Sequence, residues 1–192
     1  MIQAFRNFLT RRTFAYKLRN KAMNMFSSFE NFKSVREKAE ASREAENRPH
    51  EVLYFHKVDD PYSHLTVHYI DKFNEAYDVQ FKPILVGEEN PAALHEPKLY
   101  TDYCLEDVIR IASYYDVDFP GISYPDKKLV DKANSILTAV NSEDFGSLAK
   151  TVSYALWSGD LAKLEELEVS YKSSEQDVIE NLKKGNEIRN SC

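Results

Sequence analysis

Residues 51–86 carry the pattern that most restricts what this chain can fold into: a short apolar run, a helix start and a second apolar run. The first run, 52–55, is rich in strand formers and predicts a strand buried on both faces, while the alternation over 79–85 predicts a second strand. Asp60 and Pro61 predict a helix start between them, because aspartate caps free N–H groups and proline lacks an N–H at the first helical position. Apolar residues then follow at helical spacing almost to the second strand. The pattern predicts a β-α-β unit whose helix begins at Asp60.

The chain after this unit is predicted to be helical. Residues 87–97 contain glycine and proline and predict a loop. Helices are expected over 100–115, 129–141, 145–157, 160–169 and 174–184. Gly159 predicts the end of the helix over 145–157. The spacing of Ser174 and Asp177 resembles a capping box, and Gly185 predicts the end of the last helix. Two strands alone make a marginal sheet, so we expect the sheet to be incomplete.

The first fifty residues have a different composition. Residues 1–32 contain several arginines and lysines, and the first acidic residue is Glu30. A basic amphipathic helix can lie on an anionic membrane or act as an organelle-targeting peptide, and the alternative is a helical extension that docks on its own domain or a partner subunit. We therefore predict a basic helical extension with its linker, a β-α-β unit and a helical insertion, at 1–49, 50–89 and 90–192.

Composition excludes several classes of protein. The chain has 192 residues, is 43% hydrophobic and carries a formal net charge of -6, which argues for a packed core and against nucleic acid as a partner. Cys104 and Cys192 form no CxxC pair, so a dithiol redox motif and a cysteine zinc site are not expected. The sequence has no apolar run near the length of a membrane span and no secretory apolar segment, so we expect a cytoplasmic protein.

Three polar residues near the helix start are candidates for catalysis. Asp60 could act as a general base, or it could only cap the helix. Ser63 could contact a ligand, or satisfy backbone groups of the first turn. His56, at the end of the first strand, could transfer protons, or be a hydrogen-bonded strand-end histidine. His64 and His68 have the spacing of two metal ligands, but no third ligand is evident, and we expect no metal.

In order and spacing, these motifs resemble the DsbA-like thioredoxin-fold family, in its branch of 2-hydroxychromene-2-carboxylate isomerases and kappa-class glutathione transferases. The likeness covers about residues 52–184. Its stretches are Leu53-Tyr54-Phe55, Asp60-Pro61-Tyr62-Ser63, Phe81-Lys82-Pro83-Ile84-Leu85, Asn90-Pro91 and Lys98-Leu99-Tyr100. The resemblance implies an α/β fold with a thioredoxin-like β-α-β unit, a large all-helical insertion and, in the family, a closing ββα unit.

The resemblance also implies a ligand site, with two departures. It implies glutathione as cofactor, a small aromatic substrate, and ligand contacts from Pro61, Tyr62, Asn90 and Lys98. The family has serine or cysteine where this chain has Asp60, so the site is expected to be degenerate. The family's closing segment, with its cis-proline, does not follow Gly185, so we expect the chain to be the N-terminal part of a longer protein.

Two classes of function remain open. The first is a glutathione-linked isomerase or transferase, or more distantly a DsbA-family oxidoreductase. The second is a non-catalytic protein-interaction module, in which the helical insertion and the basic N-terminus bind a partner or a second domain. Glutathione binding separates the two classes, because only the first requires a thiol site.

Overall fold

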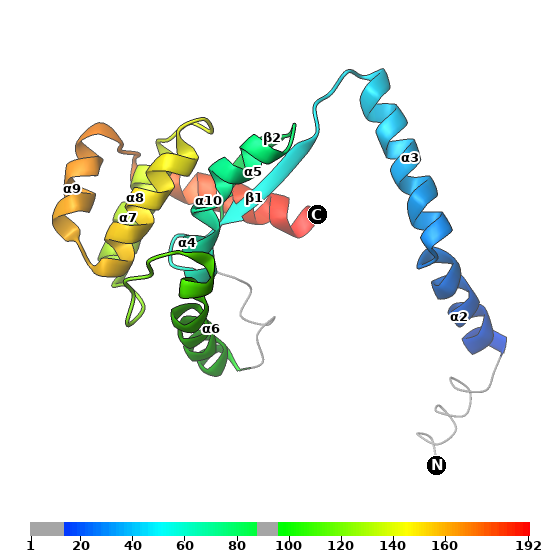
Figure 1. The fold of residues 1–192 in the computed structure, drawn as a ribbon, viewed down its shortest axis with the longest axis horizontal. Coiled ribbons are helices and arrows are strands. Elements are labelled where there is room, and N and C mark those ends of the chain that lie inside the picture. Colours follow the sequence, from blue (N-terminus) through cyan, green and yellow to red (C-terminus); the bar gives the residue numbers. More distant parts are fainter. Residues whose placement is uncertain (1–13, 88–95) are drawn as a thin grey trace, which may run out of the picture. The chain divides into compact units, whose positions relative to one another are not determined.

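The computed structural model describes residues 14–87 and 96–192, and the chain divides into two units, residues 1–50 and 51–192 (Figure 1). The second unit is mixed α/β, mostly helical, with one small parallel sheet in its described part. The expected α/β class is thereby confirmed.

The first unit consists of two helices in its described part, α2 (Phe14–Phe26) and α3 (Phe29–Ala45). Ser28 caps α3, since its Oγ accepts a hydrogen bond from the Asn31 backbone N–H at 3.2 Å. No side chain over residues 16–45 is buried. The helical extension that the sequence predicts is present from Phe14 onward, and residues 1–13 lie outside the described chain.

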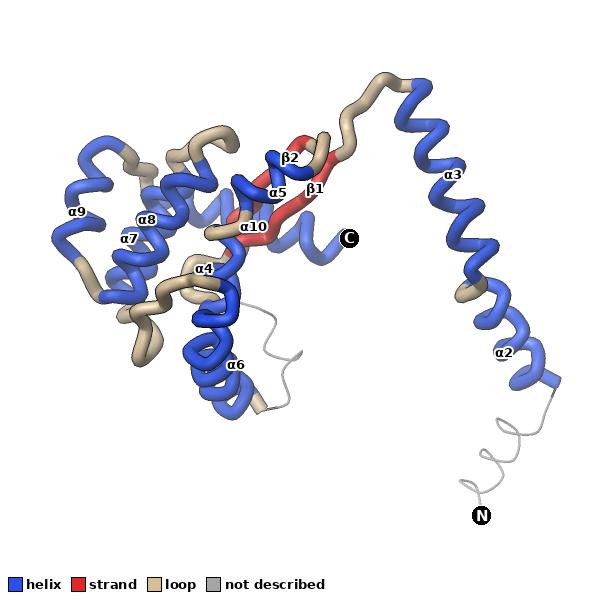
Figure 2. The backbone as a smooth tube through the Cα atoms, viewed as in Figure 1, coloured by secondary structure: helices blue, strands red, loops and turns tan. Residues whose placement is uncertain are grey.

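The second unit begins with the β-α-β arrangement that the sequence predicts. Strands β1 (Glu51–His56) and β2 (Gln80–Leu85) pair in parallel, with Val52 opposite Phe81 (Figure 2). Asp60 caps the intervening helix and Pro61 begins it, as expected.

The predicted single helix between the strands is instead two helices, α4 (Pro61–Val67) and α5 (Ile70–Ala76). The break follows Thr66, whose hydroxyl donates to the Tyr62 carbonyl oxygen at 2.9 Å, a back-bond that tends to bend helices.

The two faces of the sheet are unequally buried, so the expectation of a strand buried on both faces is wrong. On the core face His56 and Leu85 are buried. On the other face Leu53 is 39% exposed, and Lys82 forms an ion pair with Glu51. The long side chains of Lys82 and Glu51 cover part of this second face. Apolar residues of the strand can therefore lie there without being fully buried.

The remaining helices form the larger part of the unit and of its core. They are α6 (Pro97–Ile111), the 3₁₀ helix η2 (Ala112–Tyr115), α7 (Lys127–Thr138), α8 (Phe145–Ser158), α9 (Leu161–Ser170) and α10 (Glu175–Ser191). The most buried of them, α8, packs against α4, α7 and α9. Two predicted ends are confirmed: Gly159 ends α8 at φ 73°, and Ser174 with Asp177 forms a capping box. Over the described part of the chain, no helix combines the length and the apolar character needed to cross a membrane.

The last helix, α10, runs beside the sheet and holds its second strand (Figure 1). It continues through Gly185 to Ser191, so the predicted end at Gly185 is wrong. Gly185 is buried because α10 meets the backbone of β2: a Cβ at this position would lie 1.9 Å from the Leu85 carbonyl oxygen. The Gly87 N–H donates to the Asn186 side chain at 3.2 Å, which fixes α10 against the end of β2.

Candidate functional site

A pocket of about 740 Å³ lies at the carboxyl ends of the two parallel strands. Lys57 and Val86, the residues that follow β1 and β2, both line it. Open α/β sheets bind ligands at this edge, because the loops after the strands leave a crevice there. The pocket is therefore the candidate functional site.

A second groove, of about 810 Å³, lies along α7 and α10. Several of its charged side chains pair with one another, among them Lys132 with Glu168, and Lys127 with Asp131 at 2.7 Å. Its size alone does not make it a site, and the pocket at the strand ends has the chemistry that the sequence singles out.

Asp60 lies in the pocket wall as the N-cap of α4. Its Oδ2 accepts two hydrogen bonds from Ser63, one from the backbone N–H at 2.7 Å and one from the hydroxyl at 2.8 Å. Burial raises the pKa of the Asp60 carboxyl above its ordinary value, and the bonds from Ser63 oppose that rise. The capping role of Asp60 is confirmed, and its role as a general base stays a prediction.

Ser63 also lines the pocket, and its hydroxyl is engaged. The hydroxyl donates to Asp60 and accepts from the Lys57 N–H at 3.4 Å. Because the only proton of this hydroxyl points at Asp60, it is not directed at a ligand sulfur. The Ser63 hydroxyl thus links the cap of α4 to the loop after β1, and a contact of Ser63 with a ligand stays a prediction.

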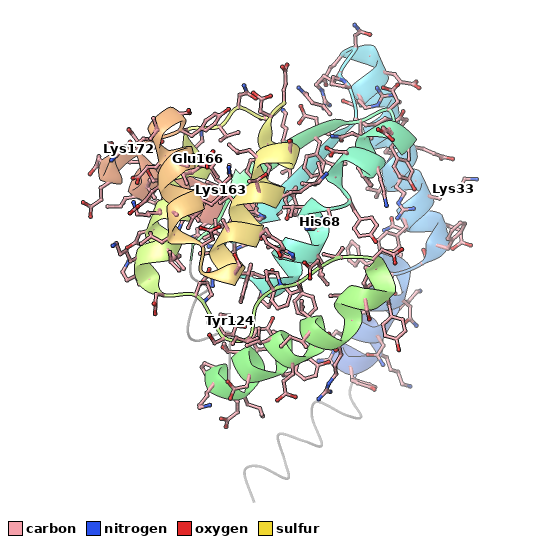
Figure 3. All side chains as sticks on the ribbon, turned by 60° about the vertical axis from the view of Figure 1, so that its left-hand side comes forward. Lys33, His68, Tyr124, Lys163, Glu166 and Lys172 are labelled. Carbon is pink, nitrogen blue, oxygen red and sulfur yellow. The ribbon has the colours of Figure 1, made fainter. Side chains whose placement is uncertain are left out.

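Tyrosines form an aromatic wall of the pocket. The Tyr62 hydroxyl donates to Asp107 Oδ2 at 2.7 Å, and the Tyr124 hydroxyl donates to the Thr101 carbonyl oxygen at 3.0 Å. Both bonds tie the wall to α6, the green helix beside which Tyr124 is labelled in Figure 3. Burial raises the pKa of both hydroxyls, so both stay neutral. Such a wall suits a flat apolar or aromatic group.

Two cationic residues complete the lining. Lys57 forms an ion pair with Asp59 at 3.0 Å. Arg189 is half-buried and comes from α10. Sequence reasoning missed Arg189 because it ended the last helix at Gly185. The signal that could have found it is helical spacing: Arg189 follows Gly185 by four residues, so the two share a face of α10.

The structure places His56 away from this pocket. His56 is 1% exposed and faces the core, where its Nδ1 lies 2.9 Å from the Tyr54 hydroxyl and its ring meets Phe145 edge-on. Its Nε2 is buried without a hydrogen-bond partner among the described residues. Burial, together with the neighbouring His64, lowers the pKa of His56 to about 3.

His64 serves the core as a structural link. Its Nδ1 lies 2.8 Å from Ser153 Oγ, and its Nε2 lies 2.9 Å from the Asp118 carbonyl oxygen. Since the carbonyl can only accept, Nε2 carries the proton and Nδ1 accepts from Ser153. Burial lowers the pKa of His64 to about 4. In the described chain, no three His, Cys, Asp or Glu side chains are grouped as a metal site requires.

The residues that the resemblance assigns to ligand contact fall in different places. Tyr62 lines the pocket, and Pro61 is fully buried behind it. Lys98 is exposed and pairs with Asp102 at 2.6 Å, outside the pocket wall, although the neighbouring Pro97 belongs to that wall. Asn90 lies outside the described residues. The pocket thus brings together Asp60, Ser63 and Tyr62.

A scan of protein-family models and a search of curated proteins both find no match for this chain. The site is therefore defined by its geometry: a pocket at the strand ends with two carboxylates, one of which caps α4, an aromatic wall and two cations.

Proposed function

We propose that this chain is a thioredoxin-like protein of the glutathione-linked isomerase or transferase type. Its pocket binds glutathione or a small aromatic substrate, and Asp60 stands where the family carries its thiol-activating residue. The observation that carries the proposal is the pocket at the carboxyl ends of β1 and β2. Its wall includes Asp60, the N-cap of α4. The order of strand, helix, strand and helical region supports the same assignment.

The lining of the pocket fits such ligands. Glutathione carries two carboxylates, and Lys57 and Arg189 supply positive charge on two sides of the pocket. Tyr62 and Tyr124 offer flat surfaces to an aromatic group. A mostly apolar pocket with a few polar groups is the usual form of a small-ligand site.

Asp60 sets the chemistry that this pocket can perform. An ionised carboxylate about 4 Å from a thiolate opposes it by about 1 to 4 kcal/mol, between the dielectric limits of water and protein surface. A helix N-terminus favours an anion by only about 0.3 to 1 kcal/mol. Repulsion therefore exceeds the helix contribution, and the Ser63 hydroxyl is already engaged. The site therefore disfavours bound glutathione in its thiolate form, with Asp60 available as a proton acceptor.

Replacing Asp60 with serine is expected to strengthen glutathione binding. Serine keeps a capping oxygen, so the free energy of unfolding should change by about 1 kcal/mol or less. Loss of the repulsion should raise the affinity by up to about a hundredfold at neutral pH. Isothermal titration of the whole chain with glutathione, with parent and variant at two pH values, measures the change. The gain should shrink at the lower pH, because a protonated Asp60 in the parent no longer repels the sulfur.

The matched control is Asp59→Ser, which removes a carboxylate from the same pocket but not from the helix cap. Because Asp59 pairs with Lys57, its loss frees one cation, and the gain in affinity should be smaller than that of Asp60→Ser. Equal gains from both variants would assign the effect to the overall charge of the pocket. Equal affinities of parent and Asp60→Ser at neutral pH would show that Asp60 does not face a thiol site.

The second candidate is a non-catalytic protein-interaction module. It is favoured by the hydrogen bonds of Asp60, which are those of a complete helix cap, and by Ile122, which is 90% exposed in the helical region. The same titration decides, because a chain of this kind binds no glutathione before or after the Asp60 substitution.

A further inference from the structure

Helix α2 carries its apolar and basic side chains on separate strips. With about 100° of turn per residue, Leu18, Ala22, Met25 and Phe26 fall within an arc of about 100°. Lys21 borders this arc on one side and Arg19 on the other. An apolar strip with cations along both borders is the pattern of a helix that lies in a membrane interface.

The apolar strip is open to solvent within its own unit. Leu18 is 56% exposed, Met25 62% and Phe26 64%. The bordering cations Lys21 and Arg19 are exposed as well. Solvent contact of three large apolar side chains on one helix face is unfavourable, so the strip is suited to burial against another surface.

The charge of the segment identifies that surface. α2 contains three basic residues and no acidic one, and the sequence has no acidic residue before Glu30. The neighbouring helix α3 also exposes apolar side chains, Phe29 among them, but its four basic residues are balanced by four acidic ones. Attraction to negative charge is therefore confined to the part of the chain up to α2.

We propose that α2 docks on an anionic lipid bilayer and lies in the plane of its surface. Leu18, Met25 and Phe26 enter the boundary between headgroups and acyl chains. Lys21 and Arg19 extend their charged ends along the border to the lipid phosphates, as long cationic side chains do at interfaces. The helix holds the protein to a membrane surface independently of what the pocket of the second unit binds.

Vesicle sedimentation with the whole chain tests this docking. The protein is expected to sediment with vesicles of phosphatidylglycerol and phosphatidylcholine and to stay in solution with phosphatidylcholine alone. Binding should weaken as salt is raised, since the charges lie at the surface. Changing Lys17 and Lys21 to glutamine should weaken binding by about fivefold per charge.

The apolar strip has a matched control on the same helix. The double variant L18S/F26S should weaken binding at least about tenfold, because it removes two large side chains from the buried strip. Met23 is also exposed but lies on the other side of Arg19, outside the arc, so M23S should bind as the parent does.

Three results would overturn the proposal. The first is failure to sediment with anionic vesicles, and the second is equal sedimentation with neutral and anionic vesicles. The third is self-association in solution that L18S/F26S abolishes, without any vesicle binding, which would make the strip an interface between copies of the chain.

Discussion

Replacing Gly185 with alanine is expected to destabilise the second unit by about 3 kcal/mol or more. The added Cβ would lie 1.9 Å from the Leu85 carbonyl oxygen and 3.1 Å from Ile84 Cγ2. The oxygen belongs to the backbone of β2, which cannot turn aside as a flexible side chain can. Helix α10 must then move away from the sheet, and overpacking of this kind costs about 1 to 3 kcal/mol and sometimes more.

The direction of this effect separates tertiary from local causes. Inside an isolated helix, alanine is more stable than glycine by about 1 kcal/mol, so helix propensity alone predicts a gain. Urea denaturation followed by the fluorescence of Trp157, the chain's only tryptophan and a buried residue of α8, measures the change. Lys184→Ala, at the exposed neighbouring position, should change stability by less than about 0.5 kcal/mol. A more stable Gly185→Ala protein would show that α10 does not contact β2 closely.

Local features of the fold could be predicted from the sequence. Asp60 with Pro61, Ser174 with Asp177, and Gly159 all mark helix ends where the structure has them. Each works through hydrogen bonds or backbone angles within a few residues, so its signal is complete in the local sequence. The parallel strand pair is predictable in the same way, from two apolar runs on either side of a helix.

Features set by distant contacts could not be predicted. In the sequence, Gly185 predicts a helix end. In the structure, this position has no room for a side chain because α10 passes close to Leu85, and only the folded chain brings these residues together. The exposed side of β1 at Leu53 has the same origin, since exposure depends on which helices cover the sheet. Arg189 was missed as a consequence of the error at Gly185.

The candidate site divides along similar lines. Asp60, Ser63 and Tyr62 line the pocket because they follow a strand end and begin a helix, which the sequence shows directly. His56 does not line it, because successive residues of a strand point to opposite faces: Phe55 faces the pocket and His56 faces the core. Which face of a strand lies toward the pocket is set by the packing of the whole sheet.

Acidification from pH 7 to pH 5 is expected to reduce the stability of the second unit by about 4 kcal/mol. Burial holds the pKa of His56 at about 3 and that of His64 at about 4, against an ordinary value of 6.5. Between these values and 6.5 the unfolded chain binds protons that the folded chain does not, so stability falls as pH falls. Each histidine contributes about 2 kcal/mol over this interval. Burial also lowers the pKa of His68, which acts in the same direction.

Asp60 acts in the opposite direction and does not cancel this loss. Its raised pKa gives stability that is present at acid pH and is lost as pH rises through the folded value. The stability that Asp60 contributes begins to change near the ordinary pKa range of a carboxyl group. The two histidines lose most of their contribution at higher pH than that. We therefore expect a net decrease over the interval from pH 7 to pH 5.

Urea denaturation at the two pH values, followed by Trp157 fluorescence, measures the loss in the parent and in His64→Gln. Glutamine can still donate to the Asp118 carbonyl oxygen but cannot titrate, so the variant should be less stable at pH 7 yet lose about 2 kcal/mol less on acidification. The cost of the substitution itself cancels, because the comparison is between two pH values of one protein. His50→Gln, at an exposed histidine before β1, is the matched control for replacing one histidine with glutamine. An unchanged acid loss in His64→Gln would mean that His64 is not held neutral by the core.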